Sequence, residues 1–419
     1  MSPDVRPDPR SNEGALRVGF VSVFPPDDPT VLSGMPFHMA RALAAAGAEV
    51  TPLVGHVEPG RPTRAARRVR RVMGRPLPSS LRRTLGSAMQ RTRERAQPII
   101  ETFAARSGRD LVGRSAALVE TALRHHEIDV LFGCSISIPL AGVKTTLPIV
   151  YFTDITARLL NAGYPDFARR GKIYKLNCDD IERRALRRAT TSVFASRWAR
   201  SSALEHYGVP ERRTRVVPMG ANITPLDQQP ARPAPRKDAP LRLCIVAASP
   251  VRKRLDLAID ATRQLVERGW NAELHYVGPE TELTRAARHV KHVGRLALSD
   301  PADRNRLGRL LHEADLMLLP SLADAFGIAA CEAAHFGCPS VVSRVGGLPE
   351  VVIDGETGLV LPVEAGAADW AHAIETLILQ PGAYSSMSSA ALRRARTRLS
   401  WNVWAREMMT ILHAAAATR

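Results

Sequence analysis

The chain has few cysteines, and their arrangement favours neither a disulfide framework nor a metal site. Its five cysteines include no CxxC pair and stand in apolar or helical contexts, which is typical of small buried side chains in a reducing compartment. No apolar run reaches the length of a transmembrane helix. The first fourteen residues are polar and rich in proline, and they lack the apolar centre of a signal peptide. We therefore expect a disordered tail over residues 1–14, a cytoplasmic protein and no metal.

Positive charge is concentrated in one segment and is low elsewhere. Residues 61–95 hold twelve arginines against a single acid, Glu94, and so account for most of the net charge of +17. Apolar residues recur there every three or four positions, a basic amphipathic pattern that suits contact with an anionic membrane from the inner face. An anionic acceptor, or solvation alone, would explain the same pattern. The segment contains no aromatic residue, so we expect no nucleic acid as partner.

Short apolar runs alternate with helical patterns in two parts of the chain. The first series fills residues 15–224, a proline-rich polar linker covers 225–240, and the second series fills 241–398. Such alternation predicts an α/β protein with two doubly wound, Rossmann-like parallel sheets that face a cleft. Ligands bind at the carboxyl ends of such strands, so the cleft is the expected site. The strands are expected at residues 16–24, 48–54, 130–134, 149–153, 192–195, 215–217, 241–247, 273–277, 289–293, 316–319, 340–343 and 359–361.

The segment of residues 319–362 carries the most specific pattern of the chain. Asp324 and Glu332 are separated by seven residues, across a Phe-Gly pair, and an alanine-rich stretch follows that stops at Gly337-Cys338-Pro339. A helix that begins after this turn would bind an anion at its free amides, and Glu332 could accept two hydrogen bonds from a diol. The pattern suits a ligand with phosphate and ribose. In an ordinary αβ unit, Glu332 would be a surface acid.

This segment resembles the donor-binding segment of retaining family 4 glycosyltransferases, which have the GT-B fold. Those enzymes carry two acids at this spacing, usually both Glu, then a glycine-proline stop and a GG-x-PE loop, here residues 346–350. The first acid is Asp324 in this chain. The resemblance implies transfer of a hexose from a nucleotide diphosphate sugar, retention at the anomeric carbon, and a last helix over residues 399–419 that packs back on the first domain.

Shorter motifs resemble a bacterial subgroup of the same family. Its members have an S-x-W-A helix start and a VPxGAN loop, which would place Gly220 and Asn222 at the cleft rim. The turn before Pro36 keeps one glycine of the family's phosphate loop, Gly34. Asp154 ends a strand, where an acid is a good site candidate.

The resemblance assigns a role to each candidate residue. Lys253, Arg252 and Gly34 would stabilise the departing diphosphate, together with the amides at the start of the helix. Glu332 would hold the ribose, Asp324 the sugar hydroxyls, and Asp154 the sugar or the acceptor hydroxyl. The donor-binding candidates are Gly34, Arg252, Lys253, Arg295, Leu296, Asp324, Ala325, Phe326, Gly327, Ile328 and Glu332, of which Arg295 and Leu296 are predicted to contact the base.

The resemblance implies no cofactor besides the UDP- or GDP-linked sugar. Cationic side chains and helix dipoles would stabilise the diphosphate in place of a metal ion. The acceptor would be a hydroxyl of a glycolipid, a polysaccharide or a secondary metabolite. Two alternatives remain open from the residues. One is a sugar-phosphate phosphorylase or epimerase on the same fold, and the other is a non-catalytic protein that binds anionic surfaces through residues 61–95.

Overall fold

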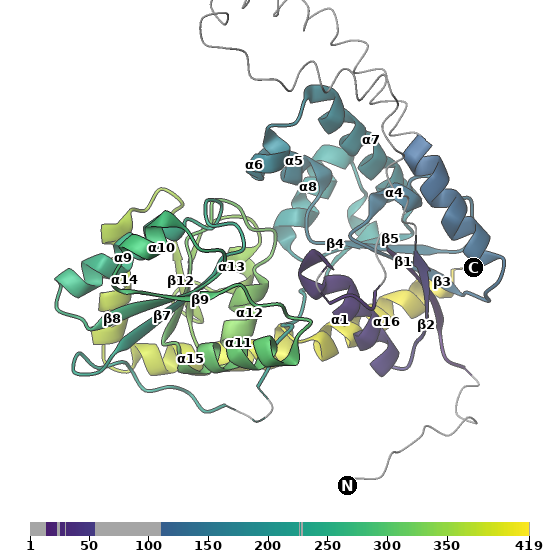
Figure 1. The fold of residues 1–419 in the computed structure, drawn as a ribbon. Helices are drawn as coiled ribbons and strands as arrows, with labels where there is room; N and C mark the ends of the chain where they lie inside the picture. Colours follow the sequence, from purple (N-terminus) through teal and green to yellow (C-terminus); the bar gives the residue numbers. More distant parts are fainter. Residues whose placement is uncertain are drawn as a thin grey trace, which may run out of the picture.

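The computed structural model describes residues 14–22, 26–29, 31–54, 110–225, 227 and 229–418. These residues form two α/β domains that lie side by side, and the last helix of the chain returns from the second domain to the first (Figure 1). The arginine-rich segment of residues 61–95 and all but the last residue of the predicted tail lie outside the described residues.

The first domain is built on a six-stranded parallel sheet with the strand order β2-β1-β3-β4-β5-β6. Its strands are β1 (Arg17–Ser22), β2 (Glu49–Val54), β3 (Val130–Cys134), β4 (Ile149–Thr153), β5 (Thr191–Phe194) and β6 (Thr214–Val216). Its helices are η1 (Val31–Gly34), α1 (Met35–Ala45), α4 (Ser137–Leu140), α5 (Ala157–Gly163), α6 (Pro165–Ala168), α7 (Lys172–Arg188), α8 (Arg197–Tyr207) and η2 (Glu211–Arg213), with a further helix over residues 110–123.

The second domain repeats this architecture with the strand order β12-β11-β10-β7-β8-β9, again parallel throughout. Its strands are β7 (Leu241–Val246), β8 (Ala272–Val277), β9 (Val290–Gly294), β10 (Leu316–Leu319), β11 (Ser340–Ser343) and β12 (Gly358–Leu361). Its helices are α9 (Leu255–Glu267), α10 (Glu282–Ala286), α11 (Pro301–Glu313), α12 (Ile328–His335), α13 (Leu348–Val351), α14 (Ala367–Leu379) and α15 (Ala383–Arg398), followed by α16 (Trp401–Ala416).

The predicted fold class is confirmed, because both sheets are doubly wound and parallel. Central strands such as β3, β4 and β10 are buried along their whole length, as expected for a sheet that is covered by helices on both faces. In each sheet the strand order reverses at one point, between β1 and β3 in the first domain and between β7 and β10 in the second. A crevice at such a reversal is where doubly wound sheets bind ligands.

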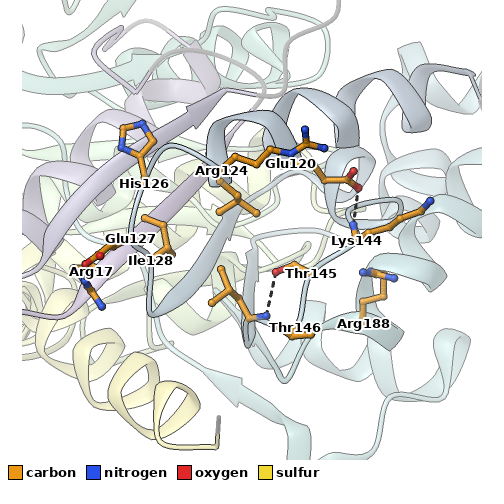
Figure 2. Close-up of a pocket in the computed structure, with 12 residues that line it drawn as sticks. Arg17, Glu120, Arg124, His126, Glu127, Ile128, Lys144, Thr145, Thr146 and Arg188 are labelled. Carbon is orange, nitrogen blue, oxygen red and sulfur yellow. Dashed lines mark hydrogen bonds and ion pairs between the residues drawn. The ribbon is translucent and has the colours of Figure 1, made fainter.

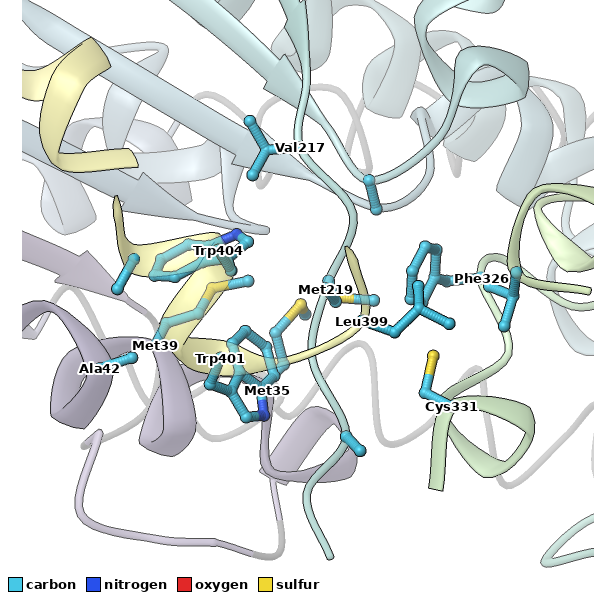
Figure 3. Close-up of a cluster of buried hydrophobic side chains, with 14 of the residues drawn as sticks. Met35, Met39, Ala42, Val217, Met219, Phe326, Cys331, Leu399, Trp401 and Trp404 are labelled. Atoms are coloured by element: carbon cyan, nitrogen blue, oxygen red, sulfur yellow. The ribbon is translucent and has the colours of Figure 1, made fainter. Parts of the chain in front are cut away.

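Helix α16 packs on the first domain through two tryptophans. The ring of Trp404 is fully buried and meets Phe132 of β3 and Phe152 of β4 edge-on, at centroid distances of 5.9 and 5.8 Å. Figure 3 shows how this cluster continues past Met219 to Phe326 of the second domain. The two domains therefore share one hydrophobic core at their junction.

Gly220, which the sequence places at the cleft rim, packs against the start of α16 at this junction. A Cβ atom at Gly220 would lie 2.2 Å from the backbone nitrogen of Trp401, so only glycine lets the two segments approach this closely. The neighbouring Ala221 donates its backbone N–H to the carbonyl of Leu399 at 3.1 Å.

A second contact between the domains is a helix cap, in which a residue of the second domain caps a helix of the first. The carboxylate of Glu350, in α13, accepts the backbone N–H groups of Arg197 and Trp198, both at 2.9 Å, at the start of α8. Ser196 caps the same helix end through the N–H of Ala199. A carboxylate at a helix N-terminus satisfies free amides and complements the helix dipole. The GG-x-PE loop and the S-x-W-A helix start thus meet at one joint.

Replacing Glu350 by alanine should weaken the joint between the domains. The variant loses two caps of α8, so we expect the free energy of unfolding to fall by about 1–2 kcal/mol. Urea denaturation followed by circular dichroism measures the change. The matched control is Glu364→Ala, since Glu364 is exposed and no hydrogen bond or ion pair is seen for it in the described structure. Equal stabilities of the two variants would show that the cap does not matter.

Candidate active site

A cavity of about 350 Å³ lies between the domains, where the loops that follow β1, β4, β7 and β10 come together. It therefore occupies the strand-order reversals of both sheets. Its walls include most of the residues that the sequence nominates. They are Leu32, Ser33, Met35, Asp154, Tyr164, Met219, Asn222, Val246, Ala248, Arg252, Lys253, Leu298, Asp324, Ala325, Phe326, Gly327, Ile328, Ala329 and Glu332.

The loop that carries Asp324 is held in place by two glycines. A Cβ atom at Gly346 would lie 1.7 Å from the carbonyl oxygen of Asp324, and one at Gly347 would lie 2.5 Å from that of Ala325. The N–H of Gly347 also donates to the Asp324 carbonyl at 3.3 Å. The glycine pair of the GG-x-PE loop is thus explained by its close packing on the acidic loop, and neither glycine lines the cavity.

The N-terminus of α12 opens toward the cavity. Gly327 precedes this helix with a φ of 111°, in the region that favours glycine, and no side chain of the described residues caps the helix there. Gly327 and Ile328 line the cavity, together with Ala325 and Phe326. A helix start with free amides and a positive dipole end is suited to bind an anionic group such as phosphate.

The predicted cations and the first acid lie together on one wall. The Lys253 ammonium forms an ion pair with the Asp324 carboxylate, and their side chains are only 11% and 12% exposed. Arg252 donates from its guanidinium to the carbonyl of Ala323 at 2.6 Å and stacks over the ring of Tyr164 at 5.2 Å. The two loops that carry these residues are therefore fixed to one another before any ligand arrives.

Glu332, in the second turn of α12, is buried with one carboxylate oxygen that has no partner in the described structure. Burial raises the pKa of this carboxyl to about 8, while a hydrogen bond from the backbone N–H of Asn222 acts in the opposite direction. A buried polar atom without a partner is costly, so its place in a cavity wall indicates a ligand that donates a hydrogen bond.

Asn222 connects Glu332 to the rest of the site. Its side-chain amide donates to the carbonyl of Ser33 at 2.6 Å and accepts from the indole N–H of Trp401 at 3.2 Å. The turn that contains Ser33 is left-handed, with φ values of 48° at Leu32, 57° at Ser33 and 76° at Gly34. Non-glycine residues adopt this conformation rarely, and it clusters at functional sites.

Asp154 faces the acidic loop from the first domain. Burial raises the pKa of its carboxyl to about 6, and the nearby Asp324 contributes in the same direction. The structure thus brings Asp154 to the same cavity as Lys253, Asp324 and Glu332, as the positions of these residues at strand ends predict. Gly34 lies one residue from the lining residues Ser33 and Met35.

Arg295 and Leu296 do not line the cavity. Gly294 turns the chain with a φ of 95°, after which Arg295 is exposed and Leu296 packs against the hydrophobic core. Leu298 lines the cavity in their place. Sequence reasoning also missed Tyr164, a polar residue after a short helix that no motif marks. The assignment of base contacts stays a prediction.

A larger hollow in the first domain lies at the opposite ends of the strands (Figure 2). Two pairs form among its lining residues: Arg17 with Glu127, and the backbone N–H of Lys144 with Glu120 at 2.7 Å. Arg17 begins β1, so the hollow is at the amino ends of the sheet, where doubly wound folds do not bind their ligands. We therefore place the candidate active site in the cavity between the domains.

Within the described part of the chain, no group of three His, Cys, Asp or Glu side chains could hold a metal ion. In the same residues, no helix is long and apolar enough to cross a membrane.

The second domain matches a known protein family. Residues 240–380 match the family described as "Glycosyl transferases group 1". This segment is a glycosyl transferases group 1 domain. It includes Lys253, Asp324 and Glu332, so one wall of the cavity belongs to the group 1 domain.

Relatives of the chain include D-inositol 3-phosphate glycosyltransferases. The protein of Rhodococcus jostii is 29% identical over 213 residues, which cover 47% of this chain and 46% of the relative. The protein of Nocardiopsis dassonvillei is 27% identical over 302 residues, which cover 67% of this chain and 68% of the relative. In the first of these matches the chain spans about half the length of the relative. The names of the relatives agree with the enzyme class that the sequence predicts.

Solved structures resemble the whole chain. Sucrose-phosphate synthase from Thermosynechococcus elongatus aligns with a TM-score of 0.65 at 17% identity, over 96% of this chain and 100% of that one. Anabaena HepE in complex with UDP and glucose aligns with a TM-score of 0.59 at 16% identity, over 95% and 100%. Together with the two parallel sheets, these neighbours confirm the predicted GT-B fold.

Breaking the pair of Lys253 and Asp324 should destabilise the fold strongly. The variant Lys253→Met leaves an uncompensated carboxylate in a largely buried place, at a cost of about 3–5 kcal/mol in the free energy of unfolding. Adding Asp324→Asn should recover most of this loss, because the second change removes the stranded charge. The control is Lys237→Met, since the Lys237 side chain is half exposed and its ammonium lies 3.8 Å from the Glu375 carboxylate, so we expect a loss of less than about 1 kcal/mol. A double variant no more stable than Lys253→Met would contradict this account.

The raised pKa of Glu332 predicts how stability changes with pH. Between the ordinary value of 4.5 and the folded value of about 8, the folded chain keeps a proton that the unfolded chain loses. Stability therefore falls as pH rises through this window, and Glu332→Gln should remove that contribution. The difference in urea-unfolding free energy between the two proteins isolates Glu332, because Asp154 titrates in both. Parallel pH profiles would show that the carboxyl titrates normally.

Proposed function

We propose that the protein is a glycosyltransferase that moves a hexose from a nucleotide diphosphate sugar to an acceptor hydroxyl, with retention at the anomeric carbon. The observation that carries the proposal is the unpartnered oxygen of Glu332, buried in the wall of a cavity that also holds the open N-terminus of α12. An acceptor of hydrogen bonds beside an anion site matches the ribose and the diphosphate of one ligand.

In the proposed complex, each part of the donor has a place. The free amides at the start of α12 and the ammonium of Lys253 would bind the diphosphate, with Arg252 as a second cation on the same wall. The ribose hydroxyls would donate to Glu332. That bond favours the ionised carboxylate, so ribose binding would lower the raised pKa of Glu332. Asp324 would accept from the sugar hydroxyls.

In the proposed reaction, the acceptor oxygen forms a bond to the anomeric carbon as the bond from that carbon to the phosphate oxygen breaks. The proton of the acceptor hydroxyl passes to a phosphate oxygen of the leaving group on the same face. The protein then contributes position and charge stabilisation, since the diphosphate gains negative charge in the transition state. Asp154 would orient the acceptor hydroxyl. The structure offers no account of the proposed membrane contact, because residues 61–95 lie outside its described part.

Removing the carboxylate of Glu332 should weaken donor binding. The variant Glu332→Ala loses hydrogen bonds from the ribose to a charged group, so we expect the dissociation constant of UDP or GDP to rise by about tenfold to a hundredfold. Isothermal titration calorimetry on the full chain measures it, first with the nucleotide that binds the unaltered protein. Glu313→Ala, an exposed acid at the end of α11, is the matched control and should bind as the unaltered protein does. Unchanged affinity in Glu332→Ala would refute the ribose assignment.

A further inference from the structure

A second cavity, of about 460 Å³, adjoins the first within the N-terminal domain. It is enclosed by the ends of β3 and β4 and by α4, α5, α6 and α7. Six residues line both cavities, namely Leu32, Ser33, Met35, Asp154, Tyr164 and Ala325. Asp154 therefore lies at the boundary between them, so a molecule in the second cavity would meet the proposed donor there.

Asn161 gives the second cavity an unsatisfied polar group. Its side chain lies in α5 and is 5% exposed, and neither its amide nitrogen nor its amide oxygen has a partner in the described structure. A buried amide without partners costs free energy, and nearly all such groups in proteins are bonded. A ligand group that both donates and accepts hydrogen bonds, such as a hydroxyl, would satisfy it.

A buried acid also lines this cavity. Glu182 of α7 is 3% exposed and accepts the hydroxyl of Tyr151 at 3.2 and 3.3 Å. Burial raises the pKa of its carboxyl to about 7. Unlike Asn161, Glu182 has a partner for its carboxylate. We therefore expect Glu182 to influence which charge a ligand can carry, and not to contact the ligand directly.

Apart from Asp154, several hydroxyl-bearing residues and Cys178, the rest of the described lining is apolar, and it carries no positive charge. Side chains such as Ile136, Ile138, Leu160, Phe167 and Ile181 form the walls, and none of the described lining residues is Lys, Arg or His. An anionic group here would lie beside two buried carboxyls, Asp154 and Glu182, and would find no cation among the described lining residues to pair with it. The lining therefore disfavours a phosphorylated or carboxylated molecule.

We propose that the second cavity binds the acceptor and that the acceptor is an uncharged alcohol with an apolar or aromatic body. Asn161 binds a polar group of this molecule, and the reacting hydroxyl lies beside Asp154. The role as acceptor rests on the proposed function, but the binding preference stands on the cavity itself. This class differs from the inositol phosphate in the name of the curated relatives, which carries a charge that the lining rejects.

The test compares three naphthalene probes on the full chain, each measured by calorimetry with and without UDP. They are naphthalenemethanol, which is uncharged, naphthyl phosphate and naphthylmethylamine. We expect the alcohol to bind more tightly than the phosphate by about tenfold or more, since the phosphate must displace water and face two acids. Benzyl alcohol and biphenylmethanol extend the uncharged set in size.

The variant Asn161→Leu separates a ligand contact from a structural role. Loss of an unsatisfied buried amide should leave the melting temperature unchanged or higher, while affinity for the alcohol falls by about tenfold. UDP binding should stay as in the unaltered protein. Asn402→Leu, an exposed asparagine on α16, is the matched control and should change neither affinity.

Each result bears on one of the two proposals. If no uncharged alcohol binds, if the phosphate or the amine binds as well as the alcohol, or if Asn161→Leu binds the alcohol unchanged, the acceptor class is wrong. If the alcohol binds and Asn161→Leu has lost affinity for it, the preference of the cavity for an uncharged alcohol is supported. This conclusion holds even if no nucleotide binds, a result that would contradict the proposed transferase function. Release of UDP from UDP-glucose that depends on the alcohol would support both.

Discussion

The arrangement of the site depends on one residue, Asn222, which joins three distant parts of the chain. Its side chain binds the carbonyl of Ser33 in the first loop and the indole of Trp401 in the last helix, and its backbone lowers the pKa of the nearby Glu332 carboxyl in α12. Ser33 and Trp401 lie on the first-domain side of the cleft, and Glu332 belongs to the group 1 domain. Asn222 therefore ties the first loop to the last helix at the place where Glu332 lines the cavity.

Around this residue, the domains are held by features of different kinds. Trp404 and its neighbours supply apolar burial, Glu350 supplies a charged cap across the joint, and Gly220 allows the close approach of the last helix. None of these residues lines the cavity between the domains. Among the described groups that do line it, one oxygen of Glu332 has no partner, the amides at the start of α12 are free of side-chain caps, and the carboxyl pKa values of Glu332 and Asp154 are raised. Fixing the joint away from the cavity lets the site keep groups that a ligand must satisfy.

The sequence predicts the sheets well. Strands that are buried on both faces, such as β3, β4 and β10, appear in it as short apolar runs with turn-forming residues before and after them. It also nominates Lys253, Asp324 and Glu332 as parts of one site, and all three line the cavity, because the loops after β7 and β10 and the helix that follows β10 meet at one edge of the sheet. It does not predict the ion pair of Lys253 with Asp324, the cap by Glu350 or the contacts of Asn222, which join residues up to 189 positions apart. Arg295 and Leu296 follow the turn at Gly294 and do not line this cavity, and their assignment as base contacts stays a prediction. Asn161 carries no sequence signal, since only burial makes an asparagine unusual.

The central claim is that the unpartnered oxygen of Glu332 receives a ribose while the start of α12 and Lys253 receive a diphosphate. A crystal structure of the full chain with bound UDP or GDP tests it most directly. The account predicts the ribose hydroxyls within hydrogen-bonding distance of Glu332 and the phosphates against the first amides of α12. A nucleotide bound elsewhere, such as the hollow beside Arg17 and Lys144, or one bound in the cleft with its ribose turned away from Glu332, would contradict it.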